Sequence, residues 1–225
     1  MRHFSESVDD YLKAILALSN GEESAVPGKA LADHLGVRAA SVTGMLQKLA
    51  AQNPPLVRYV KQHGVRLSPA GRARALEVLR HHRLLERFLH DLLGYGWDEV
   101  HEEAERLEHF ISERLEDRMA AKLGDPVLDP HGHAIPTRAG AMEPRSETPL
   151  TSWACGVPAE VSSVSDREAA TLRELARLGI GPGMPITVEA GVRSAGVRVR
   201  VGKRRQALAL RRRLAAAIRV EPRRH

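Results

Sequence analysis

The sequence has little of the chemistry on which many protein classes depend. It contains one cysteine, Cys155, so it can form neither an internal disulfide nor a zinc knuckle of several thiolates. No apolar run approaches the ~18 residues of a membrane span, and the start MRHFSESVDD lacks the apolar stretch of a secretory signal. We therefore expect a cytoplasmic protein with no membrane partner, in which any metal site uses His, Asp and Glu.

Motifs of the common enzyme classes are also missing. The chain has no GxSxG elbow, no glycine-rich loop that would cradle phosphates and no paired CxxC motif. His101-Glu102 begins a string like the HExxH of zinc hydrolases, but that motif needs a second histidine where this chain has Glu105. We expect a protein that is not an enzyme and has no small-molecule substrate.

Charge is distributed unevenly along the 225 residues, a length that suits one large domain or two to three small ones. The net charge of +6 favours a polyanionic partner only weakly. Residues 198–225 carry 11 Lys/Arg and one acidic residue, whereas residues 74–140 carry 14 Asp/Glu and nine Lys/Arg. The middle of the chain is therefore acidic, and its basic end is consistent with either nonspecific DNA affinity or solubility.

Two short helices are predicted near the N-terminus. Ser7 is a good N-cap for a run of apolar residues at helical spacing, which predicts a helix from there to about Leu18. Pro27 and Gly28 open a second helix, and Gly36 follows it where a left-handed turn is expected.

A third helix and a hairpin complete the pattern of a winged helix-turn-helix. In the third helix the apolar residues Val42, Met45, Leu46 and Leu49 fall on one face and small or polar residues on the other. The segment LVRYVKQHGVRL then alternates β-branched and polar residues around a turn at 62–64, as a two-stranded ribbon does. We assign residues 1–73 to a DNA-binding domain.

The remaining residues divide into a helical and a β-rich region. Ser68-Pro69 begins a long helix from about 70 to 93, which is long enough for dimerisation, and a second helix is predicted from about 99 to 122. Residues 137–149 have the composition of a flexible linker. Short strands around one helix, near 167–178, predict a small β-barrel in residues 150–225. The fold class is thus mainly α with a β-rich C-terminal domain, and residues 74–140 form the helical dimerisation domain.

Imidazoles and carboxylates recur at helical spacing in the acidic region. On a continuous helix four of them would project within roughly 100° of one another, because each residue advances the helix by about 100°. These four are His101, Glu105, Glu108 and His109. His82 and Glu86 repeat the i, i+4 spacing on the preceding helix, so six potential metal ligands would line one seam. Solvated faces with salt bridges to Arg83, Arg87 and Arg106 are the alternative.

Four segments together resemble the diphtheria-toxin-repressor and manganese-transport-regulator family. They are SESVDDYLKAI, LADHLGVRAASVTGMLQKLA, RHHRLLERFLHDLLG and WDEVHEEAERLEHFISERLEDR. The segment from Leu150 to Val220 is similar to the SH3-like domain that many members carry. The resemblance implies a homodimer that binds divalent iron or manganese and then binds palindromic operator DNA to repress genes of metal uptake.

The resemblance also implies a set of metal ligands. Carried over by position, they are Asp10, His82, Glu86, His101, Glu105, Glu108 and His109. Iron-responsive members have Met in place of Asp10 and Cys in place of Glu105, so the oxygen donors here favour Mn²⁺ while still allowing Fe²⁺. Manganese-type members often have a further carboxylate where this chain has Lys13. Without metal, the carboxylates are expected to repel one another.

Two points of the ligand assignment stay open. Asp10 also stands in a Ser-x-x-Asp spacing with Ser7, which would cap the first helix without any metal. In members with the third domain, a side chain of that domain can complete a metal site, and the nearest candidates are Asp166 and Glu168. The family's CPHG segment appears as Asp129-Pro130-His131-Gly132 without its cysteine, and we assign no function to that loop.

The DNA contacts are expected on the polar face of the third helix, which would enter the major groove. The residues on or beside that face are Arg38, Ala40, Ser41, Thr43, Gly44, Gln47 and Lys48. Arg58, Lys61 and Arg66 on the wing would contact phosphates. The function predicted is a metal-dependent transcriptional repressor; the alternative is a metal-buffering or interaction protein with a vestigial DNA-binding domain.

Overall fold

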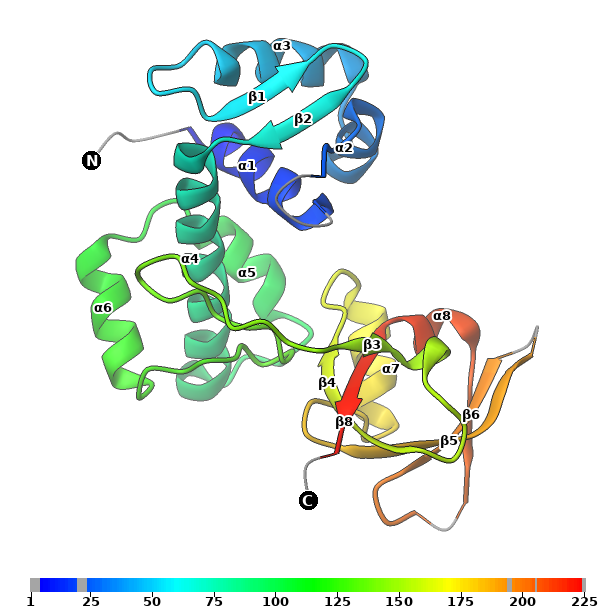
Figure 1. Cartoon of the computed structure of the whole chain (residues 1–225). Helices are drawn as coiled ribbons and strands as arrows, with labels where there is room; N and C mark the ends of the chain where they lie inside the picture. Colours follow the sequence, from blue (N-terminus) through cyan, green and yellow to red (C-terminus); the bar gives the residue numbers. More distant parts are fainter. Residues whose placement is uncertain (1–4, 20–23, 194–195, 205, 224–225) are drawn as a thin grey trace. The chain divides into compact units, whose positions relative to one another are not determined.

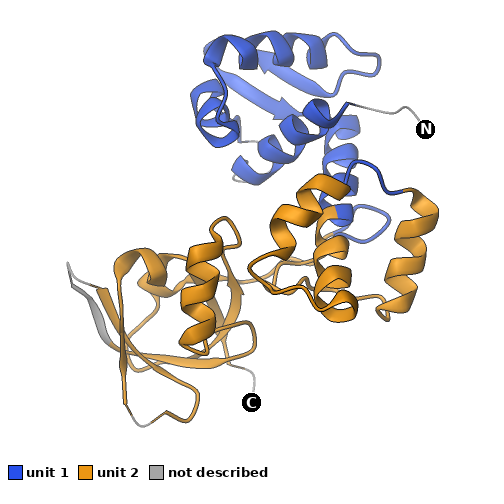
Figure 2. Ribbon diagram, turned by 180° about the vertical axis from the view of Figure 1, so that it is seen from behind, with its two compact units in different colours: residues 1–81, 108–111, 136–141 blue, residues 82–107, 112–135, 142–225 orange. Residues whose placement is uncertain are grey.

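The computed structural model describes residues 5–19, 24–193, 196–204 and 206–223. These residues form two compact units (Figures 1 and 2). Unit 1 comprises residues 1–81, 108–111 and 136–141, and unit 2 comprises residues 82–107, 112–135 and 142–225. Each unit therefore combines segments that are distant in the sequence.

Unit 1 contains the predicted winged helix-turn-helix. Its elements are α1 (Glu6–Leu18), α2 (Gly28–Leu35), α3 (Ala39–Ala50), β1 (Val57–Val60) and β2 (Gly64–Leu67). The apolar faces of the three helices meet in one core, where Leu12, Leu31 and Leu46 are almost fully buried. Gly36 has a φ of 65°, the left-handed conformation that ends α2. β1 and β2 pair antiparallel to form the wing.

Helix α1 begins earlier than the sequence suggests. Its N-cap is Ser5, no side chain caps it, and Ser7 lies inside the helix. A capping box requires the serine to stand at the N-cap. The alternative in which Asp10 serves only to cap the helix with Ser7 is therefore wrong.

The helical region differs from the prediction at one point. Helix α4 (Pro69–Leu93) agrees with it, but the single helix predicted from about 99 to 122 is two helices, α5 (Val100–Leu107) and α6 (Glu113–Lys122). Ser112 caps α6 by accepting a hydrogen bond from the Leu115 amide at 3.3 Å, and Glu113 and Glu116 stand in its first turn. These residues favour a new helix start over continuation of α5.

The C-terminal part of unit 2 is a six-stranded antiparallel sheet with the order β3-β8-β4-β5-β6-β7. The predicted strands are β4 (Pro158–Val164), β5 (Pro185–Arg193), β6 (Gly196–Val201) and β8 (Ile218–Pro222), and the predicted helix is α7 (Ala169–Arg177). The strands β3 (Thr148–Pro149) and β7 (Leu208–Leu210), the 3-10 helix η1 (Leu150–Ser152) and α8 (Arg212–Ala216) are additional. The alternating apolar residues of β6 point into the core. This part is consistent with an SH3-like domain.

The expected linker at 137–149 contains a turn near its start and a short strand at its end. The Gly140 amide donates to the Thr137 carbonyl at 2.8 Å, and the two residues of β3 pair with β8. Among the helices that the structure describes, none combines the length and the apolar character required to cross a membrane.

Candidate metal centre and nucleic-acid interface

The first group of potential ligands lies in unit 1. Asp10 comes from α1, whereas Glu108 and His109 follow the last residue of α5. His109 Nε2 lies 3.2 Å from Asp10 Oδ1 and 3.5 Å from Glu108 Oε1. The side chains of Glu108 and His109 are 0% and 8% exposed, and one donor atom from each of the three residues lies within 4.8 Å of the others. We call these three residues the Asp10 cluster.

Two positive charges lie at the Asp10 cluster, one on the neighbouring Lys13 and one on His109 of the cluster itself. Lys13 Nζ lies 2.6 Å from Glu108 Oε1. Close contacts with the carboxylates of Asp10 and Asp9, aided by the charge of Glu108 and opposed by burial, raise the pKa of His109 to about 10, so its imidazole is protonated at neutral pH. Two carboxylates thus face two positive charges. Each carboxylate of the cluster therefore has a positive neighbour that offsets the repulsion expected between the metal-free carboxylates.

A buried ion pair stands beside the Asp10 cluster. Arg74 of α4 donates two hydrogen bonds to Asp9 of α1, from Nε to Oδ1 at 2.8 Å and from Nη2 to Oδ2 at 2.6 Å. Burial raises the pKa of Asp9, but its contacts with His109, 3.6 Å away, and Arg74 lower the pKa more. Asp9 therefore fixes α1 to α4, while its neighbour Asp10 faces His109.

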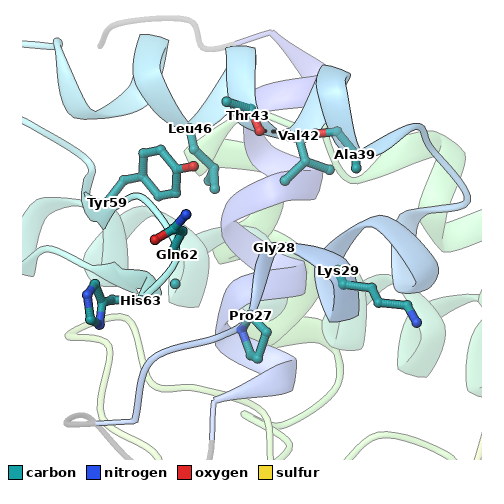
Figure 3. A pocket seen from close by; sticks show the side chains of 11 residues that line it. Pro27, Gly28, Lys29, Ala39, Val42, Thr43, Leu46, Tyr59, Gln62 and His63 are labelled. Atoms are coloured by element: carbon teal, nitrogen blue, oxygen red, sulfur yellow. Dashed lines mark hydrogen bonds between the residues drawn. The ribbon is translucent and has the colours of Figure 1, made fainter.

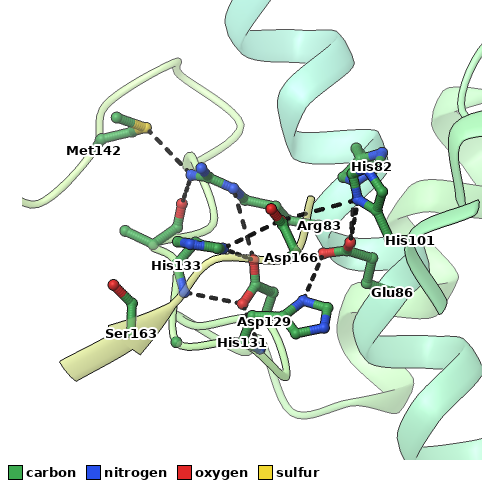
Figure 4. Close-up of polar contacts among 12 residues, drawn as sticks. His82, Arg83, Glu86, His101, Asp129, His131, His133, Met142, Ser163 and Asp166 are labelled. Atoms are coloured by element: carbon green, nitrogen blue, oxygen red, sulfur yellow. Dashed lines mark hydrogen bonds and ion pairs between the residues drawn. The ribbon is translucent and has the colours of Figure 1, made fainter. Parts of the chain in front are cut away.

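The second group of potential ligands lies in unit 2 (Figure 4). His82 Nε2 is 3.0 Å from Glu86 Oε1, and His101 Nδ1 is 3.1 Å from the same oxygen. Glu105 Oε2 lies 3.3 Å from His82 Nδ1, and the Glu105 side chain is 45% exposed. We call these four residues the Glu86 cluster.

Glu86 has a second oxygen that the helix residues do not use. Its Oε2 is buried without a hydrogen-bond partner, as is Nδ1 of His131, and the two atoms are 3.8 Å apart. Burial raises the pKa of Glu86, but its close contacts with His82, His101 and His131 outweigh burial and hold this pKa well below its usual value. Glu86 Oε2 and His131 Nδ1 are thus two buried atoms that could each bind a metal ion and that lie close to each other.

The loop from 129 to 133, to which sequence reasoning assigned no function, contributes to this group. His133 Nδ1 lies 3.2 Å from Asp129 Oδ2 and 3.5 Å from Asp166 Oδ2. Asp166 Oδ2 is also 3.9 Å from His101 Nδ1, so this carboxylate of the third domain stands beside the Glu86 cluster. Glu168 pairs with Arg213 instead. The sequence signal that could have indicated this contribution is Asp129 followed by histidines at positions 131 and 133.

The helix that was predicted to align six ligands along one seam is interrupted. His101 and Glu105 stay on α5 and face His82 and Glu86, but the helix ends before Glu108. Past that end the angular argument for a shared face no longer applies. The three arginines of the salt-bridge alternative contact other acids: Arg83 contacts Asp129, Arg87 contacts Asp91, and Arg106 contacts Glu103.

The donor atoms of both groups fit a divalent cation. Imidazole nitrogens and carboxylate oxygens bind Mn²⁺, Fe²⁺ and Zn²⁺. Glu86 Oε2 and His131 Nδ1 are buried, make no hydrogen bond and lie 3.8 Å apart, so one cation could contact both atoms once His131 is neutral. In the Asp10 cluster, His109 Nδ1 is likewise buried without a hydrogen-bond partner. Both groups therefore combine suitable donors with unsatisfied polar atoms.

The predicted DNA-binding residues share one surface of unit 1. Those exposed to solvent are Arg38, Ala40, Ser41, Gly44, Gln47 and Lys48. Thr43 is half-buried, and its hydroxyl donates to the Ala39 carbonyl at 3.2 Å. Nothing would meet a Cβ atom at Gly44 within 4 Å, so the face is open at this point.

A groove of about 290 Å³ lies between α2, α3 and the wing (Figure 3). Lys29 and His63 bring basic groups to it, and Thr43, Tyr59 and Gln62 bring polar atoms. Arg58, Lys61 and Arg66 on the wing are also exposed. The α3 residues that line the groove are Ala39, Val42, Thr43 and Leu46, so of the predicted DNA-binding residues Thr43 alone borders it.

Comparisons with known proteins match most of the chain to three domain families. Residues 3–65 match "Iron dependent repressor, N-terminal DNA binding domain", and residues 68–137 match "Iron dependent repressor, metal binding and dimerisation domain". Residues 148–222 match the FeoA domain. A solved manganese-dependent transcriptional repressor in complex with manganese is 38% identical, with a TM-score of 0.87 over 95% of this chain and 98% of that chain. The chain belongs to the iron-dependent repressor family.

Other members of the iron-dependent repressor family show the same similarity. The iron-dependent repressor IdeR of Mycobacterium tuberculosis is 35% identical over 137 residues, which are 60% of this chain and 58% of that protein. The alignment thus spans little more than half of this curated relative. The structure of IdeR from T. acidophilum is 29% identical, with a TM-score of 0.75 over 99% of this chain and 100% of that chain.

Proposed function

We propose that this protein is a homodimeric, metal-dependent transcriptional repressor that binds operator DNA in the cytoplasm when it is loaded with Mn²⁺ or Fe²⁺. The observation that carries the proposal is the Asp10 cluster. It joins Asp10, on the first helix of the DNA-binding domain, to Glu108 and His109, from the segment that matches the metal binding and dimerisation domain. An ion bound there would connect metal binding to DNA binding.

The Asp10 cluster and the Glu86 cluster are the proposed metal sites. Asp10, Glu108 and His109 would hold one ion, and His82, Glu86, His101 and Glu105 would hold another, with His131, Asp129 and Asp166 close to the latter. Because these donors are oxygen and nitrogen, Mn²⁺ is favoured and Fe²⁺ is possible. When bound, the ion supplies positive charge that several carboxylates can share.

The residues of the Asp10 cluster would couple metal binding to DNA binding through α1. Asp10 would bind the ion only while α1 lies against residues 108–109, so the ion favours that arrangement of unit 1. A coupling of about 1–3 kcal/mol changes operator affinity roughly 5- to 150-fold. That range is sufficient for a genetic switch.

Dimerisation is supported by exposed apolar side chains in and around the helical region. Phe110 is 72% exposed, Leu93 is 58% exposed and Leu115 is 45% exposed. A dimer contact would remove these side chains from water, and the match of residues 68–137 to a metal binding and dimerisation domain separately favours a dimer. Sedimentation of the purified chain measures this directly.

Operator recognition is assigned to α3, with phosphate contacts from the wing. We expect Gln47→Ala to weaken binding to the operator by about 1–3 kcal/mol and to relax the base preference at one position. Lys61→Ala should weaken binding to all sequences alike and reduce the salt dependence. A gel-shift series with single-base operator variants measures both. Equal loss for every sequence with Gln47→Ala would contradict its assignment to base recognition.

Metal uptake at the Asp10 cluster should release a proton from His109. A metal ligand must be the neutral imidazole, whereas the raised pKa of about 10 keeps His109 protonated at pH 7.5. Protons released on adding Mn²⁺, followed with a pH indicator, should fall by about one per chain in His109→Gln. An unchanged count would remove His109 from the ligand set. The raised pKa also makes stability depend on pH, because folding favours the protonated form of His109. The stability that protonated His109 contributes is complete below pH 6.5 and is lost as the pH rises towards 10.

The decisive experiment is binding of the full chain to its own upstream DNA at fixed salt, with chelator, Mn²⁺, anaerobic Fe²⁺ or Zn²⁺. Tighter binding with Mn²⁺ or Fe²⁺ than with chelator supports the repressor. Metal uptake with metal-independent or absent DNA binding would instead favour the alternative, a metal-buffering protein with a vestigial DNA-binding domain. Fixed salt is essential because phosphate contacts depend on it.

A further inference from the structure

Lys13 stands on α1 three residues after Asp10, which puts the two side chains on neighbouring parts of one helix face. Its ammonium nitrogen lies 2.6 Å from Oε1 of Glu108, a distance typical of a strong charge-assisted hydrogen bond. The side chains of Lys13 and Glu108 are 16% and 0% exposed. This ion pair thus uses an oxygen that the proposed metal site also requires.

The nearby arginine, Arg74, does not replace the contact of Lys13 with Glu108. Arg74 contacts Asp9 through two hydrogen bonds and lies 3.0 Å from Glu77 through Nη1. A fully buried carboxylate is strongly unfavourable without a compensating charge. In the metal-free protein, Lys13 supplies such a charge to Glu108.

We propose that Lys13 is an internal cation that occupies Glu108 in the absence of metal and raises the metal concentration at which the Asp10 cluster fills. The inference rests on the proposed function, because it concerns regulation of the same site. It makes Lys13 a residue that sets the threshold of the response and does not itself bind the ion.

Two effects of Lys13 act in the same direction. Its ion pair stabilises the metal-free state, so an arriving ion must displace the ammonium group from Glu108. After the ion binds, the positive charge of Lys13 remains close to it and repels it. Removal of this charge raises the free energy of the metal-free state and lowers that of the loaded state. Both changes increase the affinity for metal.

The test compares full-length Lys13→Gln and Lys13→Met, which lack the charge, with Lys13→Arg, which keeps it. Affinity for Mn²⁺ is measured by competition with a fluorescent chelator at fixed pH and salt. We expect both neutral variants to bind Mn²⁺ about tenfold more tightly than the wild type, as loss of a competing buried ion pair implies. Lys13→Arg should stay close to the wild type. The neutral variants should also unfold at lower urea concentration when metal-free, because Glu108 has lost a partner.

The contrary results are distinct from failure of the proposed function. Unchanged or weaker Mn²⁺ binding by Lys13→Gln and Lys13→Met would overturn the inference, because Lys13 would then be neutral or would position Glu108 for the ion. Equal tightening in Lys13→Arg would overturn it as well, since the charge would not be the cause. If Asp10→Asn leaves the Mn²⁺ affinity of the wild type unchanged, the proposed site itself is wrong and the inference fails with it.

Discussion

Asp10→Asn should lower the Mn²⁺ affinity of the Asp10 cluster by about 100-fold or more, since even loss of an outer partner of a ligand costs roughly 10- to 100-fold. Operator binding should then no longer respond to metal. The fold should persist, because the Asp10 side chain is 38% exposed and its ion pair is with His109, at 3.2 Å. Chelator competition measures the affinity, and circular dichroism measures the stability.

Asp33→Asn is the matched control for this substitution. Asp33 is an exposed aspartate on α2, also in unit 1, and the same change of charge there should leave Mn²⁺ affinity unaltered. If Asp10→Asn and Asp33→Asn bind Mn²⁺ equally well, Asp10 is not a ligand. The connection between metal and α1 would then be lost from the proposed mechanism.

Asp9→Asn, unlike Asp10→Asn, should cause a large loss of stability. Asp9 is 1% exposed, and its carboxylate accepts both hydrogen bonds from Arg74. Removing one charge of a buried pair costs about 3–5 kcal/mol. We expect the lower end, about 3 kcal/mol, because Arg74 keeps its contact with Glu77 at 3.0 Å. The urea midpoint of the metal-free protein should fall by roughly 1–2 M.

The measurement for Asp9→Asn must follow unit 1. Trp97 and Trp153 both lie in unit 2, so indole fluorescence does not report on α1. Hydrogen exchange of α1 amides, together with far-ultraviolet circular dichroism, is suitable. A midpoint within error of Asp33→Asn would show that the pair between Asp9 and Arg74 contributes little to the stability of unit 1.

The sequence predicted the elements that local rules determine. Apolar periodicity located α1 to α4, and Gly36 marked the end of α2 because its φ of 65° suits glycine. The alternation around 62–64 located the wing. Each of these signals lies within a few residues of the feature that it predicts.

The candidate metal site was harder to predict because its geometry depends on where a helix stops. The ligand types were identified, but the angular argument treated residues 99–122 as one helix, and Ser112 begins another. Ser112 with the acidic residues after it was a signal for that start. The partners of Glu108 come from α1, about a hundred residues earlier, and no local pattern indicates such a contact.

The contributions of the loop at 129–133 could not be derived from spacing. His131 and His133 approach Glu86 and Asp166 only through the tertiary fold of unit 2. The same holds for the choice between Asp166 and Glu168, which are two residues apart: one faces His133, and the other pairs with Arg213. Such distinctions depend on the tertiary structure and not on the spacing of residues in the sequence.

The stacking of Trp97 on His131 gives this protein an optical property. Their ring centroids are 6.0 Å apart with an interplanar angle of 29°, and Trp97 also packs against the core of the third domain. Burial lowers the pKa of His131, but the Glu86 carboxylate raises it to about 9, so the indole faces a protonated imidazole at neutral pH. A positive charge beside an indole changes its emission. The state of His131 can therefore be followed by the fluorescence of Trp97 in Trp153→Phe, separately from events at the Asp10 cluster, whose unit contains no tryptophan.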